Sequence, residues 1–161
     1  MRKDSEMATL TDIIYYLISN YPHKDELSNA RVTKMVYLAD WHAAVKLGHQ
    51  LTYIRWFFNN FGPFVTDVHS TILFSPELFT VTHTENYFGG QKTLFAVKDN
   101  NYIPSISCEE KLIIDRVIEV TKDKTWDQFI TFVYSTYPIV NSERYSQLDL
   151  VALAQEYKMK K

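Results

Sequence analysis

The residues of this sequence that could do chemistry begin with one cysteine, Cys108, and five histidines. A cysteine acts as a nucleophile when a cation, a base or a helix N-terminus stabilises its thiolate. Cys108 falls in the first turn of an expected helix, which favours such a role only mildly. We prefer the interpretation of a small residue in a first helical turn, and a cysteine-dependent enzyme stays a remote alternative.

Metal-binding and phosphate-binding patterns are missing from the sequence. Asp40 and His42 are two positions apart, so on a helix they point to different faces, and Gly48 separates His42 from His49. There is no HExxH motif and no Cys-His cluster, and the four glycines fit neither GxGxxG nor GxxxxGK followed by Ser or Thr. We therefore expect no catalytic residue, no metal, no cofactor and no enzymatic activity.

The composition limits the class of partner and the compartment. The 161 residues include 17 Lys and Arg against 19 Asp and Glu, for a formal net charge of −2. Nucleic-acid binding relies on lysine and arginine to neutralise phosphates, so nucleic acid is an unfavoured partner. A single cysteine allows no internal disulfide, no apolar run reaches the roughly 18 residues of a membrane span, and the N-terminus shows no signal-peptide pattern. We expect a cytoplasmic protein.

The elements that must position any functional residue are mostly helices, because apolar residues recur three and four positions apart. We expect about six, beginning near Thr11, Asn29, Pro63, Glu109, Trp126 and Ser146. Ser28 suits an N-cap and Gly48 a left-handed C-terminal residue. Ser107 with Glu110, and Thr125 with Gln128, have the form of capping boxes. The two helices that begin at these capping boxes are each expected to bury an apolar face. The first should bury Leu112, Ile113, Val117 and Val120, and the second Trp126, Phe129, Ile130 and Val133.

One β-hairpin is expected among the helices. Two β-rich runs, 79–83 and 93–97, flank residues 86–90, with Gly89 and Gly90 at the turn. The fold class is therefore mainly α (α+β), a single-domain helical bundle with one small hairpin. We assign residues 1–8 to an N-terminal tail, 9–158 to the domain and 159–161 to a basic C-terminal tail.

Helices followed by a hairpin could also form a winged helix. Lys92 and Lys98 would then lie on the wing. The helix expected over 64–73, however, carries Asp67 and neither lysine nor arginine, which is unfavourable for a recognition helix. Nucleic-acid binding stays a remote alternative.

Short motifs occur in a fixed order along the chain. They are Lys34–Trp41 (KMVYLADW), Gly48–Thr52 (GHQLT), Phe61–Val65 (FGPFV), Ser107–Leu112 (SCEEKL) and Thr125–Ile130 (TWDQFI). Together they resemble the Panacea domain, the SocA-like antitoxin family of bacteria, phages and mobile elements, whose members show a K-L-x-Y-x-A-D/E helix, a glycine turn and a G-P-V helix start. The resemblance covers about residues 9–155. The family often has tryptophan where Asn59 stands, whereas this chain has Trp56, so it resembles a diverged member.

The resemblance implies a protein that works by binding. Antitoxins of this kind neutralise a cognate toxin by direct complex formation, and the family's partners include toxins that inhibit translation. Some members act as adaptors that deliver the toxin to a protease. A proteolytic adaptor, or a phage or mobile-element modulator of a host protein, is therefore the alternative function. The resemblance marks as fold-defining the residues Tyr37, Asp40, Trp41, Gly62 and Pro63.

The aromatic stretch before Gly62 supplies the candidate contacts with a partner. The chain has 11 Tyr, 10 Phe and 3 Trp, and interface anchors are often Trp, Tyr and Arg. We predict partner contacts at Arg55, Trp56, Phe58 and Asn59. Phe57 and Phe61 are predicted to point inward. Tyr37 and Trp41, at i and i+4, are predicted to stack on one helix face.

Overall fold

The computed structural model describes residues 8–85 and 89–160. The predicted N-terminal tail, apart from Ala8, lies outside the described residues, as do residues 86–88 of the predicted turn and Lys161 of the C-terminal tail. Within the described part, the helices are α1 (Leu10–Asn20), a 3-10 turn (Lys24–Glu26), α2 (Asn29–Leu47), α3 (Asp67–Leu73), α4 (Cys108–Thr121), α5 (Trp126–Tyr134), α6 (Tyr137–Val140) and α7 (Leu150–Met159). The strands are β1 (Trp56–Asn59), β2 (Gly62–Pro63), β3 (Phe79–Glu85), β4 (Gln91–Val97) and β5 (Gln147–Leu148). The mainly helical fold class is confirmed.

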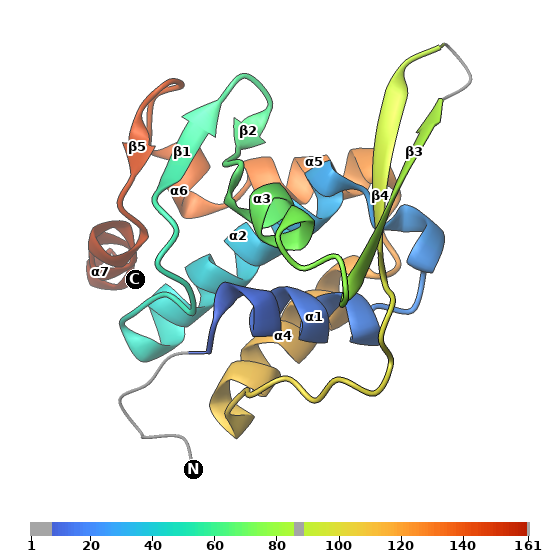
Figure 1. The fold of residues 1–161 in the computed structure, drawn as a ribbon. Helices are drawn as coiled ribbons and strands as arrows, with labels where there is room; N and C mark the ends of the chain where they lie inside the picture. Colours follow the sequence, from blue (N-terminus) through green and yellow to red (C-terminus); the bar gives the residue numbers. More distant parts are fainter. Residues whose placement is uncertain (1–7, 86–88, 161) are drawn as a thin grey trace.

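Helix α2 lies at the centre of the molecule and contacts α1, α3, α4, α7 and β4 (Figure 1). Its residues 31–40 are all buried, so it is covered on every side over more than two turns. A helix buried all round has no solvent face to carry its polar residues. Each polar side chain in this stretch of α2 therefore depends on partners that other elements provide.

The predicted caps of α2 and the two predicted capping boxes are confirmed. The Ser28 hydroxyl accepts from the backbone N–H of Arg31, and Gly48 ends α2 with φ of 82°. Both capping boxes form, at the start of α4 and at the start of α5. Each of these caps joins groups only a few residues apart in sequence, so it does not depend on how the helices pack.

The predicted hairpin is confirmed as β3 and β4, paired antiparallel from Phe79 opposite Val97 to Glu85 opposite Gln91. In Figure 1 the far end of the hairpin projects beyond the helices. Its base is fixed to the core, because Phe95 is buried and its N–H donates to the Leu27 carbonyl at 2.9 Å. The hairpin is therefore anchored to the core through the buried rings of Phe79 and Phe95.

The predicted helix start at Gly62 and Pro63 is wrong. These two residues form β2, which pairs with β1 through Phe58 opposite Pro63 and Asn59 opposite Gly62. Helix α3 begins only at Asp67. Gly62 has φ of 99°, and a Cβ there would lie 3.2 Å from the Tyr134 ring. The glycine is needed for a tight strand reversal against α5, and not for a helix.

The aromatic stretch before Gly62 forms the central strand of a three-stranded sheet. Its order is β2-β1-β5, and β5 pairs antiparallel with β1 through Trp56 opposite Leu148 and Phe57 opposite Gln147. The helix predicted to begin near Ser146 begins only at Leu150, and Gln147 and Leu148 form β5 instead. Pairing partners so distant in sequence leave no local signal in a two-residue strand.

Two predictions of burial are wrong. Leu112 is exposed on α4, and Trp126 is 45% exposed at the start of α5, whereas Ile114 and Ile118 are buried instead. Apolar spacing identifies the face of a helix, but residues at the edge of that face lie inside or outside according to what packs there.

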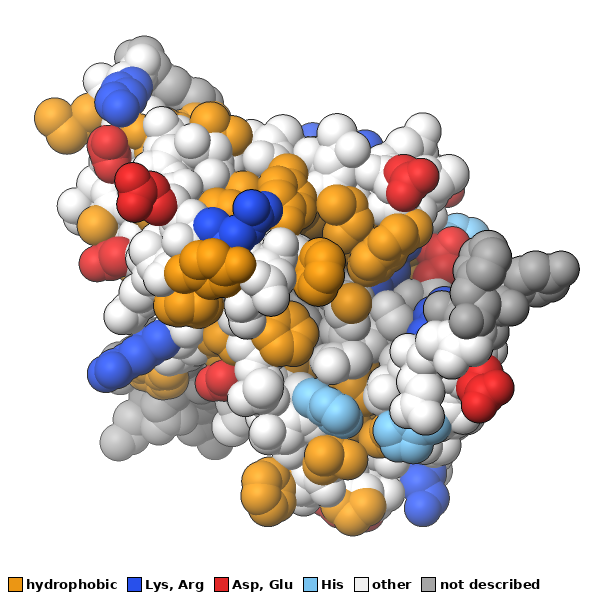
Figure 2. All heavy atoms as spheres, turned by 90° about the horizontal axis from the view of Figure 1, so that it is seen from above, with side chains coloured by type: hydrophobic (Ala, Val, Ile, Leu, Met, Phe, Trp, Pro, Cys, Tyr) orange, Lys and Arg blue, Asp and Glu red, His pale blue; other side chains and the backbone are white. Residues whose placement is uncertain are grey.

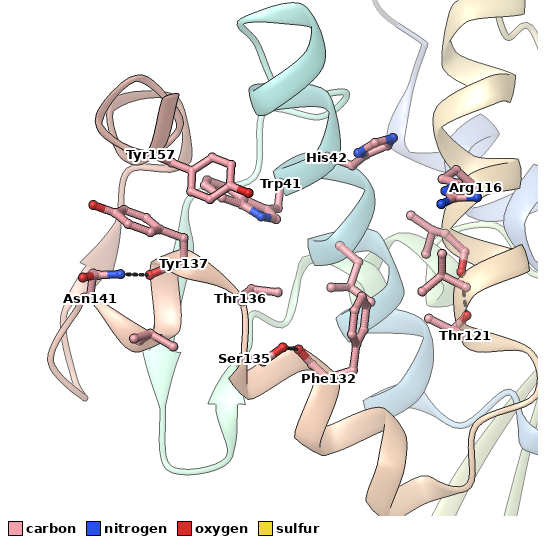
Figure 3. Close-up of a pocket in the computed structure, with 14 residues that line it drawn as sticks. Trp41, His42, Arg116, Thr121, Phe132, Ser135, Thr136, Tyr137, Asn141 and Tyr157 are labelled. Atoms are coloured by element: carbon pink, nitrogen blue, oxygen red, sulfur yellow. Dashed lines mark hydrogen bonds between the residues drawn. The ribbon is translucent and has the colours of Figure 1, made fainter. Parts of the chain in front are cut away.

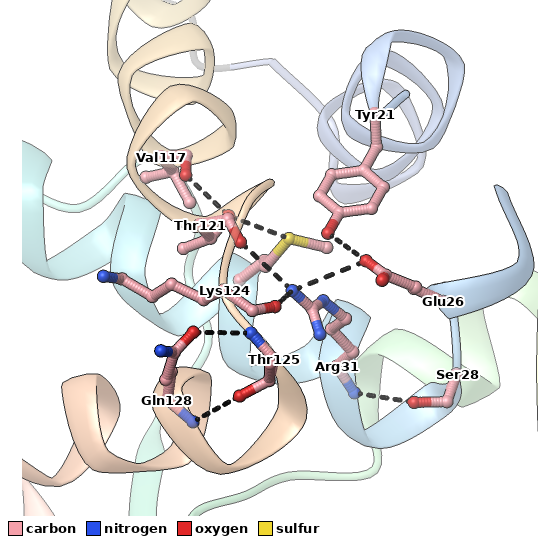
Figure 4. Close-up of polar contacts among 10 residues, drawn as sticks. Tyr21, Glu26, Ser28, Arg31, Val117, Thr121, Lys124, Thr125 and Gln128 are labelled. Atoms are coloured by element: carbon pink, nitrogen blue, oxygen red, sulfur yellow. Dashed lines mark hydrogen bonds and ion pairs between the residues drawn. The ribbon is translucent and has the colours of Figure 1, made fainter. Parts of the chain in front are cut away.

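A buried arginine joins α2 to the α4–α5 connection (Figure 4). Arg31 Nη2 donates to the carbonyls of Thr121 at 3.1 Å and Lys124 at 3.3 Å, and lies 3.7 Å from the Glu26 carboxylate. Its guanidinium also lies over the Phe129 ring, 4.5 Å from the centroid. A cation at the end of a helix satisfies carbonyls that have no partner within the helix. Arg31 thus positions α5 relative to the centre of the molecule.

Asp40 holds the loop that leads into β1. Its Oδ1 accepts from the N–H groups of Leu51 at 2.9 Å and Thr52 at 3.0 Å. Its Oδ2 accepts from the Thr52 hydroxyl at 2.6 Å, the Trp56 indole N–H at 2.8 Å and the Gln50 amide at 3.3 Å. Tyr37, one turn earlier, lies edge-on to the Trp56 ring with centroids 5.5 Å apart. One carboxylate therefore fixes the strand entry to α2.

We expect Asp40→Ala to lower the free energy of unfolding by about 3–5 kcal/mol, because buried donors each cost about 1–3 kcal/mol when left without an acceptor. Urea unfolding followed by far-UV circular dichroism measures the change. The control is Asp123→Ala, at an exposed turn residue, which should stay within about 0.5 kcal/mol of the wild type. Equal stability of the two variants would show that Asp40 does not anchor the loop.

The stability should also depend on pH through Asp40. Burial raises the pKa of Asp40 from 3.8 to about 7, although hydrogen bonds from Thr52, Trp56 and Leu51 lower it. Between these two values the folded state holds a proton that the unfolded state has lost. The contribution of Asp40 is thus complete below pH 4 and is lost as the pH rises to about 7, with a slope of about 1.4 kcal/mol per pH unit.

The comparison that isolates this slope is with Asp40→Asn, which cannot titrate. The wild type should lose stability relative to the variant over pH 4–7 in urea unfolding at matched ionic strength. Parallel pH profiles for the two proteins would mean that the Asp40 carboxyl ionises at its ordinary pKa in the folded state.

Candidate partner-binding surface

Strand β1 alternates between the core and the surface. Trp56 and Phe58 are buried, whereas Arg55 and Phe57 are exposed and Asn59 is half-buried. Because side chains of a strand point to opposite faces in turn, the Trp56–Asp40 hydrogen bond decides the side of every other residue. Trp56 and Phe58 are therefore core residues of the isolated chain, and partner contacts there stay a prediction that burial disfavours. Partner contacts at Arg55 and Asn59 stay a prediction.

The tip of the β1–β2 hairpin presents Phe61 to solvent. Phe61 is 78% exposed and Phe57 37% exposed, so the prediction that both point inward is wrong. The tip is braced from the β5 side, where Tyr145 donates its backbone N–H to the Phe58 carbonyl at 2.6 Å and its hydroxyl to Asn60. Phe61 is thus a large exposed ring on a supported turn.

One face of α5 lines a groove beside this hairpin. Trp126, Ile130 and Tyr134, spaced four apart, lie on the same side of the helix, and α2 contributes Ala30 and Lys34 to the opposite wall. Three hollows meet end to end here, since adjacent ones share lining residues. The central hollow, which we call the α5 pocket, has a volume of about 480 Å³ and is lined by Ala30, Lys34, Asn59, Asn60, Phe61, Phe64, Trp126, Ile130 and Tyr134.

The face that carries the β1–β2 hairpin is seen in Figure 2, which looks down from the top of Figure 1. Hydrophobic side chains gather across the middle of this face, and acidic side chains lie mostly toward its edges. Exposed apolar groups that gather in one patch mark sites of interaction more often than scattered ones do. The α5 pocket and the exposed rings beside it are therefore the candidate partner-binding surface.

A second hollow lies between α2, α4, α6 and α7 and has a volume of about 430 Å³ (Figure 3). Trp41 lies nearly parallel to Tyr137, with centroids 6.3 Å apart, and edge-on to Tyr157 at 5.7 Å. The predicted stacking of Trp41 on Tyr37 is thus replaced by stacking against α6 and α7. These rings fasten the C-terminal helix to α2.

The second hollow carries two basic side chains. Its described lining includes His42 and Arg116 but neither a carboxylate nor a thiol. Burial, together with Lys46 and Arg116, lowers the pKa of His42, so the ring is neutral at pH 7. A general acid–base site usually pairs such a histidine with a group that orients it.

The remaining chemical candidates stay apart in the structure. Cys108 is exposed in the first turn of α4, as predicted. Among residues 8–85 and 89–160, no three His, Cys, Asp or Glu residues lie close enough to hold a metal ion. None of the helices described is both long and apolar enough to cross a membrane.

The residues that form the groove were missed because their signals were assigned to the core. Trp126, Ile130 and Tyr134 follow a helical period that fits a buried face equally well. Phe61 precedes a glycine with positive φ, and exposed turn tips are the usual place for such a residue. Lys34 begins the motif KMVYLADW, but a lysine is ordinarily exposed, so the sequence does not indicate that it is buried beside a pocket.

Comparison with known proteins identifies a family for this chain. The family described as "Antitoxin SocA-like, Panacea domain" matches residues 32–138, more than half of the chain. The match covers α2 from Val32 onward, the β1–β2 hairpin and α5, and so includes the lining of the α5 pocket apart from Ala30. No curated protein and no solved structure matches. The chain therefore belongs to the SocA-like antitoxin family and carries its Panacea domain.

Proposed function

We propose that this protein binds a toxin protein and neutralises it by direct complex formation, with the α5 pocket and Phe61 as the contact surface. Membership of an antitoxin family supports the role. The observation that carries the proposal is the groove itself, where apolar residues from α2, α5 and the hairpin remain uncovered in the isolated chain.

The chemistry of the groove suits a protein partner. Interface cores are rich in aromatic side chains and poor in charged ones, and here Phe61, Trp126 and Tyr134 surround a single charged residue. Truncation of such central rings typically costs more than about 2 kcal/mol of binding energy. Burial of Phe61 alone, a ring held clear of the domain, would contribute about 1.5–3 kcal/mol.

The shape of the groove suits an elongated segment. The wall formed by Trp126, Ile130 and Tyr134 extends over the nine residues of α5, a rise of about 12 Å along the helix axis from the first to the last. An amphipathic helix laid in a groove uses anchors spaced in this way. We propose that the toxin contributes a helical segment of two or more turns.

The test is co-expression in bacteria with the product of the adjacent gene. That product should arrest growth alone and be harmless together with this protein. Phe61→Ser and Trp126→Ser should each weaken the complex at least tenfold and restore growth arrest, because each removes an anchor from the groove. Isothermal titration calorimetry with the purified toxin measures the affinities.

The control variant is Phe74→Ser, because Phe74 is 87% exposed and lies outside the described lining of the groove. It should neutralise like the wild type. A harmless adjacent gene product, or equal loss in all three variants, contradicts the proposal. Toxin abundance separates the mechanisms, since an amount that falls only in the presence of an intact protease indicates a proteolytic adaptor.

A further inference from the structure

A lysine lies in the wall of the α5 pocket without an acidic partner. Lys34 is only 3% exposed, yet it lines the pocket. Within the described residues its ammonium forms no ion pair and donates no hydrogen bond, and it lies 5.9 Å from the centroid of the Phe64 ring. The described lining contains no Asp or Glu.

An unpaired charge in an apolar wall is unfavourable for the folded protein. Desolvation by burial lowers the pKa of Lys34 to about 8, so the side chain is still mostly cationic at pH 7. Buried charges in proteins are ordinarily paired or hydrogen-bonded. Arg31, one turn earlier on α2, follows that rule through Glu26 and two carbonyls.

We propose that Lys34 is a specificity-determining residue, which receives an acidic side chain of a partner's apolar segment when that segment fills the α5 pocket. The inference rests on the proposed function, since it names the chemistry of the partner that this surface recognises. Lys34 Nζ supplies the positive charge, and the amides of Asn59 and Asn60 at the same pocket supply further donors. The rings of Phe61 and Trp126 hold the apolar residues on either side of the carboxylate.

Charge complementarity and the extent of the groove together favour a protein segment over a small anion. A free carboxylate ion would gain the Lys34 contact but would leave the ring surface of Phe61 and Trp126 uncovered. A segment covers both and expels water from around the charge pair, which strengthens the attraction. An apolar segment without an acid would seal Lys34 away unpaired, a cost that discriminates against such partners.

A library of random 12-residue peptides displayed on phage tests the inference without the toxin. Selection on the intact wild-type protein should enrich peptides that carry Asp or Glu flanked by apolar residues. One enriched peptide with a glutamate, and its Glu→Gln form, are then measured against the wild type and Lys34→Met. We expect Glu→Gln and Lys34→Met each to weaken binding about tenfold, and the two changes together to weaken it little further.

Folding is controlled in the same experiment. Methionine matches the length of the lysine stem and removes a buried unpaired charge, so Lys34→Met should unfold at a urea concentration no lower than the wild type. Lys111→Met, at an exposed position of α4, controls for the loss of one positive charge and should bind the peptide like the wild type. Phe61→Ser should weaken binding of both the Glu and the Gln peptide.

The outcomes that overturn the inference are distinct from those that overturn the proposed function. Selection that yields no binder, binders without an acidic residue, or an equal Glu→Gln effect in the wild type and in Lys34→Met would each overturn it. Neutralisation of the toxin by Lys34→Met at wild-type affinity would do the same while leaving the proposed function intact. A harmless adjacent gene product would remove the toxin and leave the peptide result to stand alone.

Discussion

The hydrogen bonds to Asp40 are the constraint on which the rest of this structure depends. Five donors from residues 50–56 converge on one buried carboxylate, and the last of them is the Trp56 indole. Once Trp56 points inward, the pleat of β1 places Phe58 inward and Phe57 outward. The hairpin then packs against α5, where Gly62 lies next to the Tyr134 ring. The candidate surface is thus a consequence of a contact on its far side.

Helix α2 carries three buried charged side chains whose surroundings differ. Asp40 is saturated with donors, and Arg31 is shared between a carboxylate, two carbonyls and an aromatic ring. Lys34 lies in the mostly apolar wall of the α5 pocket. Asp40 and Arg31 are paired within the fold, whereas Lys34 has no acidic partner among the described residues of its pocket. This contrast is the reason to look for a partner with an acidic residue.

Part of this fold and little of the site followed from the sequence. Ser28, Gly48 and both capping boxes act on neighbouring backbone groups, so they locate helix ends correctly. Pro63 predicts a helix start because proline suits a first helical turn, but a Gly-Pro pair also fits a strand reversal at a sheet edge. Trp56 and Phe58, two candidate contacts, lie on the buried face of β1. The sequence has rings on both faces of this strand, so its period-2 pattern does not say which face is buried. Trp126 follows a helical apolar period that predicts burial, but it lies at the edge of the buried face of α5 and is exposed.

The sequence by itself determined the helical class, the helix ends, the β3–β4 hairpin and the order of motifs that matches the antitoxin family. Only the tertiary structure decided which rings are exposed, that β5 completes a sheet with β1, and that Lys34 lies unpaired beside Phe61 and Trp126. Helix caps and turns depend on groups a few residues apart, so they form independently of the tertiary contacts. Exposure and charge pairing depend on residues far apart in sequence, which meet only when α2, the hairpin and α5 pack together.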